Sequence, residues 1–242
     1  MSKRIILITG ANKGIGFETA RQLASAGHHI ILGARDPDKG AAAVARLAAE
    51  GLSAEAIDLD VTSDASIARA VAQVSERHGK LDTLINNAGV AIEGWGTTAS
   101  QTPLAQWHTI FATNVFAVAA VTQAFLPLLH KSDAGRIVNV SSILGSLTLH
   151  ADPASPIYDF KSVAYDSSKA ALNQYTIHLA HELRGTNIKI NSGHPGWVKT
   201  DLGGDAAPME VTDGAKTNVW LATLPDDGPT GGFFHFQERL PW

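Results

Sequence analysis

The amino-acid sequence predicts a doubly wound α/β fold, in which one parallel sheet of about seven strands carries helices on both faces. Short apolar runs rich in Ile, Val and Leu alternate along all 242 residues with longer segments of helical periodicity, and this alternation is typical of a parallel sheet. The runs at 4–9, 29–34 and 135–141 are largely apolar, as expected for strands that are covered on both faces. No Pro- and Ser-rich linker divides the chain, so residues 1–242 are expected to form a single domain.

Each apolar run is assigned to a strand, and each periodic segment to a helix. The expected strands are residues 4–9, 29–34, 53–59, 81–86, 135–141, 187–192 and 231–236. The expected helices are residues 15–27, 38–50, 64–79, 103–130, 164–184 and 211–223. The stretch TSDAS at 62–66 offers an N-cap to the third helix, and the alanine-rich stretch 41–49 fits an ordinary surface helix.

The composition narrows the classes of function. The chain has no cysteine, which excludes disulfides, thiolate catalysis and Cys-ligated metals. Its formal net charge of −4, without long basic runs, argues against nucleic-acid binding. No uninterrupted run approaches the roughly 18 apolar residues of a membrane span. The apolar run in the starting stretch MSKRIILITG is too short for a signal peptide. We therefore expect a cytoplasmic protein that binds neither nucleic acid nor membrane.

The loop after the first strand, TGANKGIG, contains Thr9, Gly10, Gly14 and Gly16. Its glycines allow a tight turn and a close approach to a pyrophosphate, and the helix that follows offers free N–H groups and the positive end of its dipole. The spacing G-x-x-x-G-x-G differs from the common G-x-G-x-x-G, and alone it fits a structural turn equally well. Its position between an N-terminal strand and a helix favours a dinucleotide site of the Rossmann type.

Two tyrosines in the stretch IYDFKSVAYDSSKAAL are each followed by a lysine. A free tyrosine has a pKa of about 10, and an ammonium group about 4 Å away is expected to lower it by about three units. Tyr165 and Lys169 are four residues apart, which places them on one face of a helix. Tyr158 and Lys161 follow ADPASP, whose prolines indicate a loop. We therefore expect Tyr165 to be the catalytic acid–base and Lys169 its electrostatic partner.

Six further motifs follow the glycine loop in a fixed order. They are DVT at 60–62, NNAG at 86–89, Asn114 in TNVFA, VNVSS at 138–142, YDSSK at 165–169 and HPGWVKT at 194–200. With these motifs the chain resembles the short-chain dehydrogenase/reductase family over nearly its whole length. On TGANKGIG, GARD and PGWVKTD it is most similar to the NADPH-dependent carbonyl reductases of that family.

The resemblance implies a cofactor site that is formed by the glycine loop and several later segments. Its expected members are Gly10, Asn12, Lys13, Gly14, Ile15, Gly16, Arg35, Asp60, Val61, Asn87, Ala88, Gly89, Tyr165, Lys169, Pro195, Gly196, Val198 and Thr200. In the family pattern Asp60 holds the adenine amino group with help from the Val61 backbone, although Asp60 is also a good helix cap. The Val198 backbone and Thr200 are expected to hold the nicotinamide carboxamide and the nearby phosphate, and Asn87 to support the backbone.

The end of the second strand, LGARDPDKG, bears on the choice between NAD and NADP. An acidic residue at this strand end favours NAD, and in the family register that position is Ala34. Asp36 is a rival for the role, but it precedes a proline, where Asp commonly starts a turn or caps a helix. Arg35 and Lys13 offer two cations to a 2′-phosphate, so we expect NADP(H).

The family pattern also implies a catalytic set of Asn114, Ser142, Tyr165 and Lys169. Ser142 ends the fifth strand and is expected to orient and polarise a substrate carbonyl, with Ser141 structural. Asn114 is expected either to be a buried polar tie or to hold a water in a proton relay through Lys169. We expect reduction of a small ketone or aldehyde, with Tyr165 as proton donor. Alternatives are an NAD-dependent secondary-alcohol dehydrogenase and a non-catalytic dinucleotide sensor.

The substrate pocket is less defined by the sequence. Its candidates are Trp95, Leu144, Tyr158 and Trp197, the last of which could equally be plain packing. The stretch 148–160 is longer than in compact members of the family and is expected to form a lid or a pocket wall. Monomeric carbonyl reductases have a longer insertion here, so the choice between monomer and homo-oligomer stays open. No metal is expected, because the histidine pair 178 and 181 lacks a third ligand.

Overall fold

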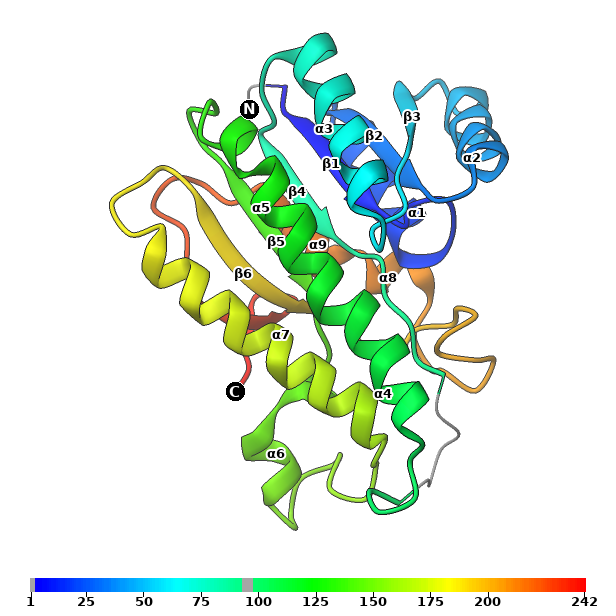
Figure 1. The fold of residues 1–242 in the computed structure, drawn as a ribbon, viewed down its shortest axis with the longest axis vertical. Helices are drawn as coiled ribbons and strands as arrows, with labels where there is room; N and C mark the ends of the chain where they lie inside the picture. Colours follow the sequence, from blue (N-terminus) through cyan, green and yellow to red (C-terminus); the bar gives the residue numbers. More distant parts are fainter. Residues whose placement is uncertain (1–2, 93–97) are drawn as a thin grey trace.

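A central sheet with helices on both sides forms the computed structural model, which describes residues 3–92 and 98–242 (Figure 1). The strand order is β3-β2-β1-β4-β5-β6-β7-β8. The strands are β1 (Ile5–Thr9), β2 (His29–Ala34), β3 (Ala54–Asp58), β4 (Thr83–Asn86), β5 (Arg136–Val140), β6 (Lys189–His194), β7 (Phe233–His235) and β8 (Glu238–Arg239). The helical segments are α1 (Gly14–Ser25), α2 (Pro37–Ala49), α3 (Asp64–His78), α4 (Leu104–Phe111), η1 (Ala112–Phe116), α5 (Ala117–Leu129), η2 (Ile143–Gly145), α6 (Leu147–Ala151), α7 (Val163–Glu182), α8 (Val211–Gly214) and α9 (Lys216–Ala222).

The predicted fold class is confirmed. Strands β1 to β7 pair in parallel, and β8 pairs antiparallel with β7. The sequence does not predict β8, because a strand of two exposed residues carries no periodic pattern.

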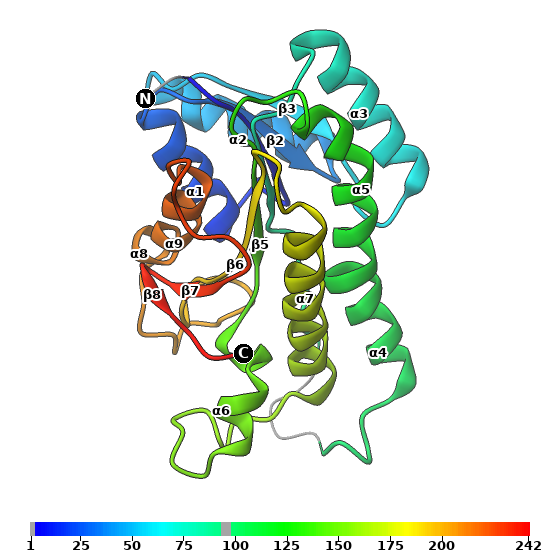
Figure 2. The same ribbon diagram turned by 90° about the vertical axis from the view of Figure 1, so that its left-hand side faces the viewer.

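The two faces of the sheet are covered by two helical layers (Figure 2). Side chains of β1 alternate between them: Leu7 joins a core cluster with α3, α5 and α7, whereas Ile6 and Ile8 join a cluster with α1, α2 and α9. Because successive residues of a strand point to opposite faces, a strand covered on both faces must be apolar along its whole length. This explains the unbroken apolar run that predicts β1.

Two of the expected helices are interrupted. The predicted helix 103–130 consists of α4 and α5 joined by a π-helical turn, η1. The predicted helix 211–223 divides into α8 and α9, and α8 ends at Gly214, a residue type with low helix propensity. The π turn contains Asn114 and is buried there, and single π turns inside α-helices are frequent at functional sites.

One helical stretch of the described chain, Leu104–Leu129, is long and apolar enough to cross a membrane by length and composition. The sequence prediction of no spanning segment is based on uninterrupted apolar runs, and this stretch contains polar residues. Its mean hydropathy nevertheless reaches 1.6 over 18 residues. In the structure the stretch packs against α3, α7 and β4. A helix that covers a sheet meets the same criterion as a spanning helix, so this one is weak evidence for a membrane.

The order of the strands fixes where a ligand can bind. The chain runs from β1 outward to β2 and β3, and then returns to place β4 on the other side of β1. In open α/β sheets the crevice at the carboxyl ends of the strands around such a reversal is the usual ligand site. The glycine loop follows β1, NNAG lies at the end of β4, and Ser142 follows β5, so the structure brings these predicted motifs to one edge of the sheet.

Candidate functional site

The glycine loop passes so close to the segment after β4 that side chains are excluded at two of its positions. Gly10 has φ of +63°, and a Cβ there would lie 3.0 Å from the Cα of Ala88. A Cβ at Gly16 would overlap the side-chain amide of Asn87 and lie 2.9 Å from the carbonyl oxygen of Gly10. The glycines are therefore required by close packing between the two loops.

The N-terminus of α1 is suited to an anion. The helix begins at Gly14, its N-cap residue Lys13 makes no side-chain capping hydrogen bond, and its first turn holds no acidic residue. The first N–H groups of a helix lack intrahelical partners, and together with the helix dipole they favour a phosphate. This end of α1, with Asn12 and Ile15 beside the turn, fits the pyrophosphate of a dinucleotide.

The segment after β4 is anchored to β1 by hydrogen bonds. The backbone N–H groups of Asn87 and Ala88 both donate to Thr9 Oγ1 at 3.0 Å. Asn87 Nδ2 donates to the carbonyl oxygens of Thr9 at 2.9 Å and Gly10 at 3.2 Å. The predicted backbone-supporting role of Asn87 is therefore what the structure shows.

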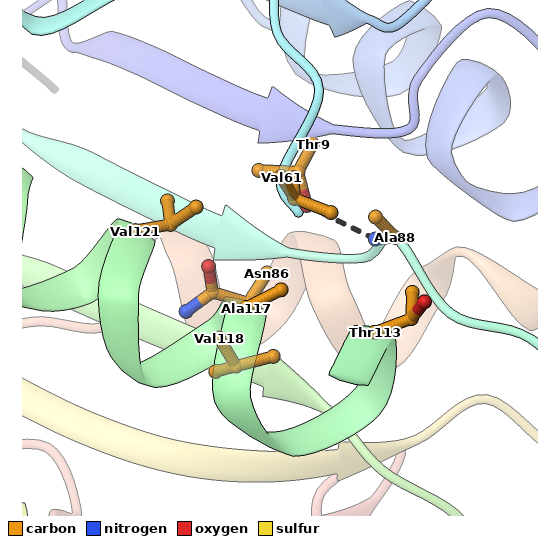
Figure 3. Close-up of a pocket in the computed structure, with 8 residues that line it drawn as sticks. All are labelled: Thr9, Val61, Asn86, Ala88, Thr113, Ala117, Val118 and Val121. Atoms are coloured by element: carbon orange, nitrogen blue, oxygen red, sulfur yellow. Dashed lines mark hydrogen bonds between the residues drawn. The ribbon is translucent and has the colours of Figure 1, made fainter. Parts of the chain in front are cut away.

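A small pocket lies beside this anchor (Figure 3). The space is too narrow for a water molecule, and its lining comes from the ends of β1 and β4, the segment after β3 and the η1–α5 turn. The lining residues are Thr9, Val61, Asn86, Ala88, Thr113, Ala117, Val118 and Val121. The pocket includes two of the predicted cofactor residues, Val61 and Ala88, and adds residues of η1 and α5 that the motifs do not single out.

Asp60, next to this pocket, has a structural role in the turn before α3. Its Oδ1 accepts hydrogen bonds from the Thr62 N–H at 2.9 Å and the Thr62 hydroxyl at 2.7 Å. These bonds lower the pKa of Asp60, so the group is ionised at neutral pH. The N-cap of α3 is Ser63, whose hydroxyl accepts from the Ser66 N–H at 3.3 Å. If Asp60 contacts an adenine as predicted, it does so with a carboxylate that Thr62 already orients.

At the end of β2, the two positions considered for an NAD-favouring acid, Ala34 and Asp36, differ in their surroundings. Asp36 is the N-cap of α2 and accepts from the N–H groups of Asp38 at 3.1 Å and Lys39 at 3.3 Å. It therefore serves the helix, as its place before Pro37 predicts. Arg35 is exposed at this strand end, and its charge helps to lower the pKa of Asp60. Ala34, the position of the NAD-favouring acid, is buried.

Lys13, the second expected cation, has a partner that the sequence does not predict. Its ammonium forms an ion pair with the Asp201 carboxylate, and both side chains are largely exposed. The pair joins the glycine loop to the segment after β6. The same two segments approach at Gly14, where a Cβ would lie 3.5 Å from the Thr200 methyl group.

The expected catalytic side chains meet at the end of β5. A hydrogen bond joins the side chains of Tyr165 and Ser142. Lys169, one helical turn beyond Tyr165, is 5 % exposed and donates from Nζ to the carbonyl oxygen of Val140 at 2.8 Å. A Cβ on Gly89 would lie 3.7 Å from Lys169 Nζ, so the lysine also borders the segment after β4. Tyr165, Ser142 and Lys169 are thus brought together as predicted.

Burial decides the ionisation of this pair. Burial raises the pKa of Tyr165 to about 12. The charge of Asp166 also raises this pKa, and the hydrogen bond with Ser142 lowers it by less than burial raises it. Burial also lowers the pKa of Lys169 to about 8. The expectation that Lys169 depresses the pKa of the tyrosine is wrong for this state of the protein. The lysine lies 5.6 Å from the centroid of the Tyr165 ring, and removal of the phenol from water outweighs its attraction.

Asn114 is fully engaged in protein hydrogen bonds. Its Oδ1 accepts from the Val90 N–H at 2.9 Å, and its Nδ2 donates to the Val90 carbonyl oxygen at 2.9 Å and to Ser168 Oγ at 3.0 Å. The Ser168 hydroxyl in turn donates to the Tyr165 carbonyl oxygen at 2.7 Å. The side chain is therefore a polar tie between η1, the segment after β4 and α7, and its role in a water relay stays a prediction. Ser141 donates to Asn173 Oδ1 at 2.7 Å, which is the structural role expected for it.

The segment after β6 contains the expected nicotinamide contacts. Pro195 precedes Gly196, whose φ is +98° and where a Cβ would lie 2.7 Å from Met209 Sδ. Val198 is buried and forms a β-bridge with Met209. Thr200 Oγ1 accepts from the Gly203 N–H at 3.1 Å. The backbone of the segment is therefore hydrogen-bonded to Met209.

His194, at the end of β6, is a site residue that the motifs do not identify. Its Nδ1 accepts from the N–H of Ile143 at 3.2 Å, directly after Ser142. Burial lowers the pKa of His194 to about 3, with a contribution from His235, so the ring is neutral at physiological pH. The histidine preceding Pro-Gly in HPGWVKT is the signal that could have been used, because it ends β6, the strand next to β5.

The substrate-pocket candidates are only partly brought to the site. The Leu144 N–H donates to Ser142 Oγ at 3.2 Å, which places its backbone beside the expected catalytic serine. Tyr158 is 37 % exposed, with Lys161 Nζ 4.8 Å from its ring centroid. Trp197 is 46 % exposed, and its indole N–H donates to the Gly203 carbonyl oxygen at 2.8 Å, which favours packing over a pocket wall. Trp95 lies outside the described residues.

The stretch 148–160 is not a plain loop, since it begins inside the short helix α6. His150 Nε2 lies 2.9 Å from the Leu144 carbonyl oxygen and 3.4 Å from Asp166 Oδ2. The Ser162 N–H donates to the same Asp166 oxygen at 2.9 Å. These contacts attach the insertion to both the serine loop and the helix that carries Tyr165, so it borders the site as expected.

Comparisons with known proteins agree with this arrangement. The family model described as short chain dehydrogenase matches residues 4–210. The short-chain dehydrogenase anuI of Penicillium roqueforti is 39% identical over 230 residues, covering 92% of this chain and 90% of that protein. Carbonyl reductase [NADPH] 1 of Mus musculus is 33% identical over 285 residues, covering 100% and 99%. The crystal structure of NADPH-bound carbonyl reductase from chicken fatty liver has a TM-score of 0.87 and 30% identity, with both chains fully covered.

Proposed function

The chain belongs to the short-chain dehydrogenase family, and we propose that it reduces ketones or aldehydes to alcohols with NADPH as the hydride source. The observation that carries the proposal is the hydrogen bond between Ser142 and Tyr165, with Lys169 one helical turn away, at the carboxyl edge of the sheet. This group lies next to the loops that are shaped for a dinucleotide. A substrate carbonyl in this position has its oxygen next to the hydroxyls of Ser142 and Tyr165. Its carbon then faces the cofactor bound by the glycine loop and the segment after β4.

Tyr165 acts as the proton donor. With its pKa raised to about 12 by burial, the phenol is protonated at neutral pH and ready to give its proton to the carbonyl oxygen. The charge that then forms on Tyr165 Oη is stabilised by the nearby ammonium of Lys169, which is mostly charged at pH 7 because its pKa is about 8. General-acid catalysis of this kind contributes about 10²–10⁴-fold to a rate.

Ser142 and the backbone around it orient the carbonyl. The Leu144 N–H already donates to Ser142 Oγ, which fixes the hydroxyl oxygen and directs its hydrogen toward an acceptor. His194 holds the adjacent Ile143 N–H through Nδ1. The serine therefore requires little rearrangement when substrate binds, which favours catalysis through preorganisation.

NADPH is proposed over NADH on the charges near the adenosine end of the site. Ala34 supplies no carboxylate to the ribose hydroxyls, Asp36 is committed to the α2 cap, and Arg35 is exposed beside them. The printed names of the mouse relative and the chicken structure specify NADPH for those proteins. A 2′-phosphate between Arg35 and Lys13 is the arrangement that these residues favour.

The test is a panel of ketones and aldehydes, with consumption of NADPH and of NADH followed by absorbance for the native protein and for Tyr165→Phe. We expect turnover with NADPH, at least about 100-fold slower for Tyr165→Phe, with NADPH binding retained by fluorescence titration. Tyr175→Phe, at the other tyrosine of α7, is the matched control and should keep most of the activity. Full activity of Tyr165→Phe would overturn the mechanism, whereas faster turnover with NADH would overturn only the cofactor preference.

A further inference from the structure

A cluster of three metal-binding side chains lies away from the site described above. His29 Nε2 and His78 Nε2 both approach Glu55 Oε1, at 3.1 Å and 2.5 Å, and the three ligand atoms lie within 4.8 Å of one another. The two imidazole ring centroids are 5.0 Å apart. All three residues are partly buried.

Three separate elements hold the cluster in place (Figure 1). His29 begins β2, and Glu55 lies near the start of β3, which pairs with β2 in parallel. His78 is the last residue of α3, and the helix is closed there by Gly79 in the left-handed conformation. The cluster therefore sits at the amino ends of the strands, whereas the proposed reductase site lies at their carboxyl ends.

The chemistry of the three groups suits a divalent transition metal. Two imidazole nitrogens and one carboxylate oxygen, with water in the open position, are a set that binds Zn²⁺ in tetrahedral geometry. We propose that His29, Glu55 and His78 bind one Zn²⁺ ion, which links the edge strand β3 to β2 and α3. This ion takes no part in the proposed reductase reaction, because no group of the reductase site belongs to the cluster.

Arg77 also belongs to the surroundings of the proposed site. Its Nη1 donates to Glu55 Oε2 at 2.6 Å, leaving the other carboxylate oxygen to face both imidazoles. Burial acts to raise the pKa of Glu55, but hydrogen bonds from His29, His78 and Arg77 outweigh it and lower the pKa, so the ligand is a carboxylate. The positive charge of Arg77 opposes a cation bound at Glu55, so Arg77 competes with the metal for this carboxylate.

The sequence predicts no metal, because the ligands are far apart along the chain. His29 and His78 are separated from Glu55 by 26 and 23 positions, so no motif of fixed spacing connects them. The pair that the sequence does suggest, His178 and His181, belongs to no cluster of metal-binding side chains among the described residues. His181 Nε2 lies 2.8 Å from the Arg184 guanidinium, a positive group.

The experiment uses the full chain after dialysis against a chelator. Zn²⁺ is titrated by calorimetry, and the melting temperature is measured against Zn²⁺ concentration. We expect one ion per chain and a melting temperature that rises by about 5–11 °C when free Zn²⁺ is a hundredfold above Kd. His29→Gln, His78→Gln and Glu55→Gln should each weaken binding at least tenfold.

Two controls make the outcome decisive. Arg77→Gln removes a competing cation, so it should bind Zn²⁺ at least as tightly as the native chain, and the double variant His178→Gln/His181→Gln should bind it equally. Each variant is compared with and without the metal, so a loss of stability from the substitution itself does not affect the conclusion. The absence of a one-to-one complex in the native chain, or binding that survives all three ligand substitutions, would show that the cluster is only a hydrogen-bond network.

Discussion

The ammonium nitrogen of Lys169 lies 5.6 Å from the centroid of the Tyr165 ring and donates to the backbone carbonyl oxygen of Val140 at 2.8 Å. The lysine is thus held by the last residue of β5, two positions before Ser142. Helical spacing places the two side chains on one face, and the strand sets the distance between them. Both groups are held largely out of water, which keeps the phenol protonated and makes the ammonium easier to deprotonate.

The pH dependence of cofactor capture should follow Lys169. Its folded pKa is lowered to about 8 by burial, so its charge is present below this pH and is lost above it. The ratio kcat/KM for NADPH reports ionisations of the cofactor-free protein, and we expect it to fall up to about tenfold per pH unit above roughly pH 8. Lys13→Gln should weaken NADPH capture at every pH but leave the break in the same place. A ratio that stays constant up to pH 10 would contradict the assignment.

Asp36 should matter for stability and not for the choice of cofactor. Its carboxylate caps α2 through the N–H groups of Asp38 and Lys39. Asp36→Ala should therefore lower the melting temperature by about 2–4 °C, while Asp36→Asn, which keeps a capping oxygen, should restore most of it. The ratio of initial rates with NADPH and NADH should be unchanged in both variants. A large shift toward NADPH in Asp36→Asn would show that this carboxylate acts against the 2′-phosphate.

Asp201 should compete with the cofactor for Lys13. The two side chains form an exposed ion pair across the glycine loop and the segment after β6, and a phosphate bound by Lys13 must displace Asp201. Asp201→Asn should therefore tighten NADPH binding by about two- to fivefold, the range that exposed ion pairs allow, and leave NADH binding unchanged. Asp205→Asn removes the same charge from the same segment and serves as the control. Fluorescence titration gives both dissociation constants; weaker NADPH binding in Asp201→Asn would mean that the pair supports the site.

Much of the site could be predicted because its parts follow strands in sequence. The glycine loop after β1, Asn87 after β4 and Ser142 after β5 are found from local patterns, and parallel strands bring their carboxyl ends together. The i, i+4 spacing of Tyr165 and Lys169 is likewise a local property of one helix. Such features depend on short-range geometry, which a sequence displays directly.

The remainder depends on contacts between distant segments. The Lys13–Asp201 pair joins residues 188 positions apart, and His194 meets the Ile143 N–H across 51 positions. The direction of the Tyr165 pKa shift also could not be predicted from the spacing, because burial is set by the packing of the whole domain. The π turn at Asn114 shows no break in hydrophobic periodicity, so a plain helix is the natural prediction there.

The neutral state of His194 has a consequence for acid stability. The ring is buried, its Nδ1 accepts from a backbone N–H, and its neighbour His235 lies 4.9 Å away between ring centroids. Protonation would remove the acceptor and place a charge in a buried position beside the His235 ring. The folded pKa is about 3 and the unfolded value about 6.5, so only the unfolded chain takes up this proton between these values, and stability is lost as the pH falls below 6.5.

The variant His194→Asn isolates this effect, since the amide oxygen can replace Nδ1 as acceptor but does not titrate. Between pH 6 and pH 4.5 the native chain should lose about 1 kcal/mol per pH unit more free energy of unfolding than His194→Asn. Urea denaturation at several pH values measures the difference, and activity at pH 7 shows whether the acceptor has been preserved. His130→Asn, at an exposed position, should keep the acid sensitivity of the native chain. Parallel pH profiles for the native chain and His194→Asn would mean that the ring is protonated in the folded protein, and that Nδ1 is not the acceptor holding the Ile143 N–H beside Ser142.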